Sequence, residues 1–429
     1  MNLKYGLNDQ PGITETLLYG LQWIALFIPV LIIIGKLVAG LHYTSPEQQI
    51  LYLQKVTFVS AVLLVIQVLW GHRLPLITGP ATVLLVGILA CQSNSIASVY
   101  SAILIGGLLL AFLAFSGLFN YLQVLFTPRV VVSILMLIAF TLLPTIINLI
   151  IGRESGVTPA ANLIFVTLLT LAIFTANKYL QGIWKTTLIV WAILAGTLAY
   201  WLFFPASLSF NGLTNLKPLG NWFTTLGFNF YIEPGVLISF LFCFLALSIN
   251  DLGSIQSLGS LLQAAKMNKR IQRGIGLTGM GNILAGAFGV IGPVNFSLSP
   301  GVIAATGCAS RFTLLPAGLG LLVLSFSPMV LGFIGNIPQV IIGCILIYLM
   351  SSQIAAGLLM AYEKKAINIY DEGVIIGLPL IIATITAFLP PDIINTFPKN
   401  MRPIIGNGFV MGVITVIILE HLIFKDKRK

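Results

Sequence analysis

Charged residues are scarce in this sequence. Only 8% of the 429 residues are Asp, Glu, Lys or Arg, whereas soluble domains contain roughly 25%. Hydrophobic residues make up 58% of the chain, and the mean hydropathy is +1.02. Several apolar runs reach the length of about 20 residues that a helix needs to span a bilayer. These features exclude a soluble fold and predict an all-α polytopic membrane protein that lies in the lipid bilayer.

Residues and motifs for metal binding and catalysis are also scarce. Cysteines are found at four separate positions within apolar runs, with neither metal-ligand nor disulfide spacing, and are predicted to be packing residues. The sequence has only three histidines, and none lies in the middle of an apolar run. It contains no nucleotide-binding loop, no G-x-S-x-G motif and no H-E-x-x-H motif. We therefore expect neither an enzyme nor a cofactor, and no transport driven by the chain's own ATP hydrolysis.

Basic residues lie mainly in short loops and at the C-terminal tail, which argues against nucleic acid as the reason for the net charge of +10. With fourteen predicted spans and the tail inside, sixteen Lys and Arg residues fall on the inner side and four on the outer side. This asymmetry follows the positive-inside rule and predicts an inner-membrane protein with both termini cytoplasmic. Lys36 and Lys55 belong to neither side, because they lie near predicted span ends, where we expect them to snorkel outward.

Two short apolar segments, 79–91 and 299–309, are too short to be full spans. The sequence Gly79-Pro80-Ala81-Thr82-Val83 is echoed by Ser299-Pro300-Gly301-Val302-Ile303, an offset of 220 residues, and a second echo has an offset of 210. Seven spans per half is an odd number, so the two halves would have opposite topology. Paired interrupted segments in corresponding positions are typical of the binding site of an inverted-repeat transporter. A seven-plus-seven inverted repeat is therefore predicted.

The stretch 289–307 is apolar but contains two prolines and four glycines, which forbid one unbroken helix. We expect a short extended piece over 293–297, with Val294 and Phe296 on one side and Asn295 and Ser297 on the other. A half-helix should then begin near Ser299, where Pro300 takes an early position that needs no N–H. Its N-terminus would direct partial positive charge and free N–H groups at a solute.

Asp251 is the one acidic residue well inside an apolar run. A charge in a span is unfavourable by at least about 2.5 kcal/mol, so such a residue is a functional candidate by default. Helical spacing aligns Asp251 and its neighbour Asn250 with Ser254 in a polar stripe. The alternative is that Asp251 lies near the inner interface and pairs with Lys266 or Arg270.

Four parts of the chain together resemble one family of transporters. They are Tyr19-Gly20-Leu21-Gln22, Gly71-His72-Arg73-Leu74-Pro75, the eighth span with its basic loop through Asn282 to Gly289, and Ser299-x-Gly301-x4-Thr306-Gly307. In these residues the chain resembles the nucleobase–ascorbate transporter family, also called the uracil–xanthine permeases. The resemblance extends over most of the chain in order.

The resemblance implies a seven-plus-seven inverted repeat with short strands before two half-helices that frame the solute site. It also implies a core domain, from 1–127 and 233–334, and a gate domain, from 128–232 and 335–429. Uracil, xanthine, uric acid and ascorbate are the usual solutes, with H+ or Na+ coupling. The chain departs from the family pattern at its centre. Asn250 stands in place of the glutamate in span eight, Ser254 in place of an ionisable residue, and Leu298 and Ser299 in place of an acidic or amide residue and an asparagine.

The predicted function is secondary transport of a small polar solute, by resemblance a purine or pyrimidine nucleobase, through alternating access. The expected solute-binding residues are Thr82, Asn250, Ser254, Ser297, Leu298 and Ser299, and Asp251 is the expected coupling residue. Three alternatives stay open: an anion transporter of sulfate-permease-like architecture, an uncoupled facilitator, and a non-transporting membrane binding protein. The sequence also leaves open whether the protein forms a homodimer.

Overall fold

The computed structural model describes residues 3–152, 157–205, 220, 222–223, 229–296 and 299–424. Within these ranges the chain is mostly helical, with one two-stranded sheet. Eight helical segments of the described chain are long and apolar enough to cross a membrane. They are Ile13–His42, Pro46–Leu69, Ile96–Phe115, Pro128–Ile151, Pro159–Tyr179, Pro234–Leu261, Gln339–Glu363 and Tyr370–Ala387. Three further apolar helices are shorter, at Leu188–Phe203, Arg311–Leu324 and Gly408–Ile423.

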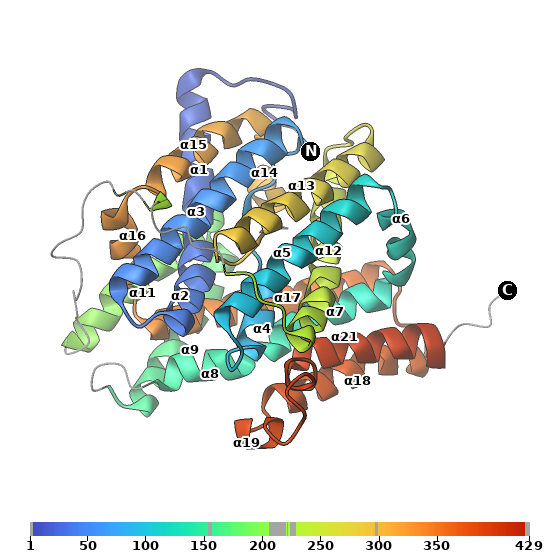
Figure 1. The fold of residues 1–429 in the computed structure, drawn as a ribbon. Coiled ribbons are helices and arrows are strands. Elements are labelled where there is room, and N and C mark those ends of the chain that lie inside the picture. Colours follow the sequence, from blue (N-terminus) through green and yellow to red (C-terminus); the bar gives the residue numbers. More distant parts are fainter. Residues whose placement is uncertain are drawn as a thin grey trace.

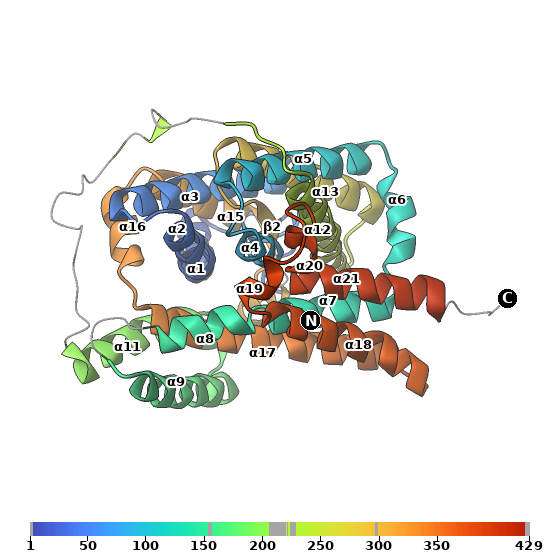
Figure 2. The ribbon, with the colours of Figure 1, turned by 60° about the horizontal axis from the view of Figure 1, so that its bottom comes forward.

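The helices form two groups that pack against each other, and in Figure 2 the first group lies above the second. The first group contains α1 (Ile13–Val30), α3 (Pro46–Leu69), α4 (Thr82–Ala90), α5 (Ile96–Phe115), α12 (Pro234–Leu261), α13 (Met267–Ala287), α14 (Ser299–Thr306), α15 (Leu314–Leu324) and α16 (Pro328–Gly335). The second group contains α7 (Pro128–Thr141), α8 (Leu143–Ile151), α9 (Pro159–Tyr179), α11 (Leu188–Phe203), α17 (Gln339–Glu363), α18 (Tyr370–Ala387) and α21 (Gly408–Ile418). Each group draws on both halves of the chain.

Close helix packing holds the first group together. Helices α5 and α13 run side by side (Figure 1) and approach each other through glycine. A Cβ atom on Gly279 would lie 2.5 Å from the backbone nitrogen of Ala111, and one on Gly107 would lie 2.7 Å from the carbonyl oxygen of Gly279. Small residues at such an interface allow backbones in a membrane to approach and gain van der Waals contact. The region therefore tolerates no side chain at these glycines without moving a helix.

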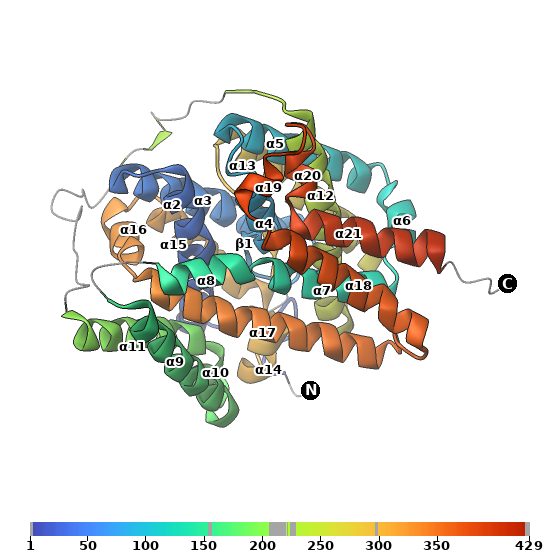
Figure 3. The same ribbon diagram turned by 90° about the horizontal axis from the view of Figure 1, so that it is seen from below.

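An arginine connects three elements of the second group. Arg129 on α7 pairs with Glu372 on α18 at 2.7 Å and with Glu420 at 2.8 Å, in the π-helical turn (Leu419–Ile423) that follows α21. The side chains of both glutamates are less than a tenth exposed. Helix α17 runs along α7 and α8 in the same group (Figure 3). The pairing explains why charged residues are tolerated at this place among apolar helices.

The first helix continues from α1 through a π-helical turn, Leu31–Lys36, into α2 (Leu37–His42). Pro29 lies inside α1 just before this turn, and its missing N–H interrupts the regular hydrogen bonding there. Lys36 therefore lies inside a helix of 30 residues. Its ammonium donates a hydrogen bond to the carbonyl oxygen of Ile337, between α16 and α17. The expectation that Lys36 snorkels outward from a span end stays a prediction.

The two interrupted segments each form a strand followed by a short helix, as expected. Strand β1 (Thr78–Pro80) leads to α4, and β2 (Pro293–Asn295) leads to α14. The strands are antiparallel, and Thr78 pairs with Asn295 while Pro80 pairs with Pro293. The pairing continues past the two prolines, because the Ala81 N–H donates to the Gly292 carbonyl oxygen at 2.9 Å. Since hydrogen-bonded and non-hydrogen-bonded pairs alternate in an antiparallel ladder, Pro80 and Pro293 occupy a pair that needs no N–H. The eighth expected span, 234–254, is longer in the structure because α12 continues to Leu261.

The structure corrects the register of the sequence echo. Helix α4 begins at Thr82 and α14 begins at Ser299, 217 residues later, whereas β1 begins at Thr78 and β2 begins at Pro293, 215 residues later. The sequence comparison had instead matched Pro80 with Pro300. These prolines have different positions, because Pro80 ends a strand and Pro300 lies in the first turn of a helix.

Candidate functional site

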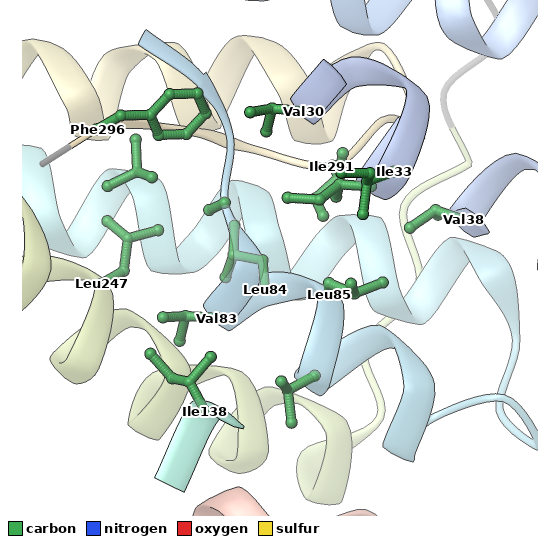
Figure 4. Packing of buried hydrophobic residues seen from close by; sticks show 14 of the residues in the cluster. Val30, Ile33, Val38, Val83, Leu84, Leu85, Ile138, Leu247, Ile291 and Phe296 are labelled. Carbon is green, nitrogen blue, oxygen red and sulfur yellow. The ribbon is translucent and has the colours of Figure 1, made fainter. Parts of the chain in front are cut away.

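A cavity of about 250 Å³ lies where the strand–helix units face the second group of helices. Its apolar wall includes Val30, Ile33, Val83 and Phe296 from the first group, and Ile138 from α7. Figure 4 shows these side chains, with Val83 beside Ile138 and with Phe296 and Val30 on the far side of Val83. The cavity therefore lies between the two helix groups and takes its lining from both.

Four polar side chains line the same cavity. Thr82 begins α4, Asn250 lies on α12, and Ser352 and Gln353 lie on α17. An amide group offers both donors and an acceptor, and a hydroxyl offers one of each. Together with the ring of Phe296, these groups suit a small planar molecule with amide-like edges, since aromatic rings stack and amides pair with such edges. Among the residues that the structure describes, this lining contains neither a cation nor a carboxylate.

Asp251 lies behind the strand pair and does not line this cavity. Its side chain is fully buried, and Oδ1 accepts a hydrogen bond of 2.6 Å from the Asn295 amide. Its Oδ2 has no hydrogen-bond partner among the described residues. The salt bridges of the described chain do not include Asp251, and Arg270 instead donates to the carbonyl oxygens of His72 and Arg73. The interfacial ion pair that was the alternative for Asp251 is absent from these contacts.

Asn295 is the centre of a buried polar network. Its Oδ1 accepts from the Thr78 hydroxyl at 2.9 Å and faces His72 Nε2 at 3.2 Å, while its Nδ2 donates to Asp251. His72 Nδ1 accepts from the backbone N–H of Leu74 at 3.0 Å, so the ring proton is on Nε2 and points at Asn295. The network therefore ties β2 to β1, to α12 and to the loop after α3.

Two of the predicted solute-binding residues contact the strands instead of the cavity. The hydroxyl of Ser254 donates to the carbonyl oxygens of Asn250 and Asn295, at 2.8 and 3.2 Å. The hydroxyl of Ser299 accepts from the backbone N–H of Ile77 at 3.1 Å. Both side chains hold backbone in place next to the cavity. Ser297 and Leu298, the other two residues predicted between the strand and α14, lie outside the described residues.

Sequence reasoning missed three polar residues of this region. His72 was not among the predicted site residues, although it lies in a motif that carries the family resemblance. Ser352 and Gln353 were not predicted either, although Ser351-Ser352-Gln353 is the polar interruption in the otherwise apolar α17. That interruption was a usable signal, because polar groups in a span face the protein interior or a cavity.

Comparison with known proteins agrees with this geometry. The model of the Permease family Xan_ur_permease matches residues 14–392. Similar proteins include the nucleobase transporter PlUacP of Paenibacillus larvae, which is 22% identical, with 92% of each chain covered. The xanthine permease of Bacillus subtilis is 23% identical, covering 97% of this chain and 96% of its own. The uric acid permease PucJ of the same organism is 25% identical, with 92% and 90% covered.

Solved structures with a similar fold are transporters too. The transmembrane domain of the cyanobacterial bicarbonate transporter BicA superposes with a TM-score of 0.59 at 18% identity, covering 86% of this chain and 94% of that one. The murine anion transporter Slc26a9 also gives 0.59, at 12% identity, with 96% and 69% covered. At these identities the likeness concerns the fold alone. From the family match over nearly the whole chain, this protein belongs to the xanthine–uracil permease family and is a multi-pass membrane transporter, not an enzyme.

Proposed function

We propose that the protein transports a purine or pyrimidine nucleobase, such as uracil, xanthine or uric acid, and binds it in the central cavity. The observation that carries this proposal is the lining. Amide and hydroxyl groups of Asn250, Gln353, Thr82 and Ser352 surround a small space beside the Phe296 ring. The names of the similar permeases point to the same class of solute.

The transport mechanism in this proposal is alternating access between two domains. The first helix group, from 1–127 and 233–334, is the core domain, and the second, from 128–232 and 335–429, is the gate domain. A cavity lined by both groups supports this division, since relative movement of the groups would open it to either side. Fourteen membrane segments in two inverted repeats are part of the proposal. The antiparallel pairing of the two strand–helix units supports this symmetry.

Coupling to H+ or Na+ is assigned to Asp251. Its buried position and its bond to Asn295 at the back of β2 support a role in proton exchange. The proposal also places the protein in the inner membrane, with both termini on the cytoplasmic side. Thiol labelling of Lys269→Cys and Lys399→Cys tests this topology, because only the second should react from outside.

The test of the function is uptake into proteoliposomes of labelled uracil, xanthine, urate and sulfate. We expect saturable uptake of at least one heterocycle and none of sulfate. Asn250→Leu should weaken heterocycle uptake about tenfold, as expected when one well-placed hydrogen bond is lost. Asn336→Leu is the matched control, because the side-chain amide of Asn336 donates to the carbonyl oxygen of Gly332 in the helix that it follows.

Each alternative function predicts a different result in this assay. Sulfate uptake without heterocycle uptake would establish an anion transporter instead. Heterocycle uptake that ignores imposed pH and Na+ gradients would establish an uncoupled facilitator. Binding without any uptake would establish a non-transporting binding protein.

A further inference from the structure

Three arginines meet at the end of α3, in the first helix group. Arg311 follows α14 and donates through Nη1 to the carbonyl oxygen of Val68 at 2.8 Å. Arg73 lies in the turn after α3 and donates through Nε to the carbonyl oxygen of Leu69 at 3.0 Å. Arg270, in the first turn of α13, donates through Nη1 to the backbone carbonyl oxygen of Arg73 at 3.0 Å. Backbone groups within one short stretch therefore hold all three guanidinium groups.

The positive charges of these arginines repel one another. Coulomb repulsion from Arg311 and Arg73 acts on the guanidinium of Arg270, and repulsion from Arg73 acts on that of Arg311. The ion pairs of the described chain include none of the three. Asp9 is linked to this region by its backbone carbonyl, which accepts from the Ser310 hydroxyl, while its carboxylate accepts a backbone N–H of the N-terminal segment. An anion bound among the arginines would reduce their repulsion.

The backbone of Arg73 is strained. Its φ is +55°, in the left-handed region, which is uncommon for residues other than glycine. This conformation is unfavourable for a residue with a Cβ atom, and strained residues cluster at functional sites. The side chain is exposed, and only the Nε–H of its five N–H groups bonds within the described chain. The strained turn therefore presents a guanidinium group at the surface, beside two half-buried arginines.

The cluster lies at the level of a membrane interface. Trp70 directly follows the apolar helix α3 and is 60% exposed. Tryptophan is enriched where the hydrocarbon of a bilayer meets the lipid head groups. On α15, which packs along α3, Leu319 and Val323 are also largely exposed. This apolar surface suits the acyl chains of a lipid whose head group reaches the arginines.

We propose that Arg73, Arg270 and Arg311 bind the phosphate group of an anionic lipid. Phosphate oxygens accept charge-assisted hydrogen bonds, which are about twice as strong as neutral ones, and the planar guanidinium group matches their geometry. The ammonium of a zwitterionic lipid would meet the same repulsion as a fourth cation, so the site prefers phosphatidylglycerol to phosphatidylcholine. The site does not depend on which solute is transported. Arg270 also donates to the carbonyl oxygen of His72 at 2.7 Å, so a bound lipid would stabilise the turn before β1.

Thermal unfolding of the purified full-length protein in a neutral detergent tests this site. The four free cysteines are buried, and a thiol-reactive dye reports their exposure on unfolding. Added phosphatidylglycerol should raise the apparent melting temperature by several degrees and should saturate, whereas phosphatidylcholine should not raise it. Inorganic phosphate at the same concentration should also have no effect, because it lacks the acyl chains that contact the apolar surface.

Substitutions separate the cluster from the overall surface charge. Arg73→Asn removes one charge and keeps a residue that tolerates the left-handed region. This variant, and likewise Arg311→Gln, should need about fivefold more phosphatidylglycerol for half of the rise, as expected for one basic residue near a membrane surface. Arg73→Lys keeps the charge and should need less lipid than Arg73→Asn. Lys365→Asn is the matched control, because Lys365 is an exposed basic residue after α17 with a φ of +48°, and it should leave the lipid response unchanged.

The proposal fails in any of four cases. Equal responses to the two lipids would exclude selectivity for an anionic head group. Equal stabilisation by inorganic phosphate would assign the arginines to a soluble anion. Equal weakening in Arg73→Asn and Lys365→Asn would show that the lipid responds to total surface charge. An unchanged response in both Arg73→Asn and Arg311→Gln would place the bound lipid elsewhere.

Discussion

Replacing Asn295 by alanine should destabilise the protein more than replacing any asparagine outside the strand pair. The side chain of Asn295 is fully buried and joins three separate elements. It accepts from Thr78 on β1 at 2.9 Å and faces His72 at 3.2 Å, and it donates to Asp251 on α12 at 2.6 Å. Alanine would leave all three partner groups buried and without their contact to the Asn295 amide.

The size of the effect follows from these three contacts. Hydrogen bonds between segments of a membrane protein contribute about 0.6 kcal/mol on average and up to about 1.7 kcal/mol. Loss of three such bonds therefore corresponds to about 2 to 5 kcal/mol of folding free energy. The upper part of this range is expected, because the abandoned groups are buried in a region that water does not reach.

Thermal unfolding in detergent can be followed with a dye that fluoresces on reaction with thiols. The four free cysteines are all buried and become reactive only on unfolding. Asn295→Ala should lower the apparent melting temperature by several degrees, and Asn336→Ala by little, since Asn336 donates within its own helix. Equal melting temperatures for the two variants would refute the assignment of Asn295 as the centre of the network.

Two further predictions concern charged residues. Asp251→Asn should abolish solute accumulation driven by a pH gradient while leaving solute exchange, because an amide can still bond to Asn295 but exchanges no proton. Gradient-driven accumulation in proteoliposomes that equals that of the wild type would contradict the coupling role. Arg129→Gln should lower the apparent melting temperature well below that of Lys4→Gln. The first change leaves two largely buried carboxylates without their arginine, whereas the Lys4–Glu15 pair is exposed. Similar melting temperatures for the two variants would show that the Arg129 pairs do not hold the second helix group together.

The interrupted backbone at the centre was predictable from the sequence. Proline and glycine at fixed places in an apolar run leave few arrangements, and the half-helix starting at Ser299, with Val294 and Phe296 on one side of the extended piece before it, follows from them. That this side faces the cavity is known only from the structure. The register between the halves was not predictable in the same way. Pro80 and Pro300 look equivalent in the sequence, yet only pairing of the strands decides which residue of one half opposes which of the other.

The site itself was harder to predict than the backbone. Asn250 and Asp251 are adjacent, and helix geometry places them about 100° apart. Which of them faces the cavity depends on how α12 is rotated against β2, and this rotation is set by packing over the whole helix. Gln353 lies on α17, about 100 residues after Asn250 in the sequence, so its presence in the cavity depends on how the two helix groups meet.

The pairing of β1 with β2 has a consequence for how the protein is made. The two strands of the pair are separated by 217 residues, from Thr78 to Asn295. At a synthesis rate of about 5 to 20 residues per second, β1 waits about 10 to 40 s for its partner to emerge from the ribosome. During that time its backbone N–H and C=O groups would be unpaired at membrane depth, which hydrocarbon does not tolerate. The nascent first half must therefore keep β1 in contact with water or with the insertion machinery until Pro293–Asn295 arrives.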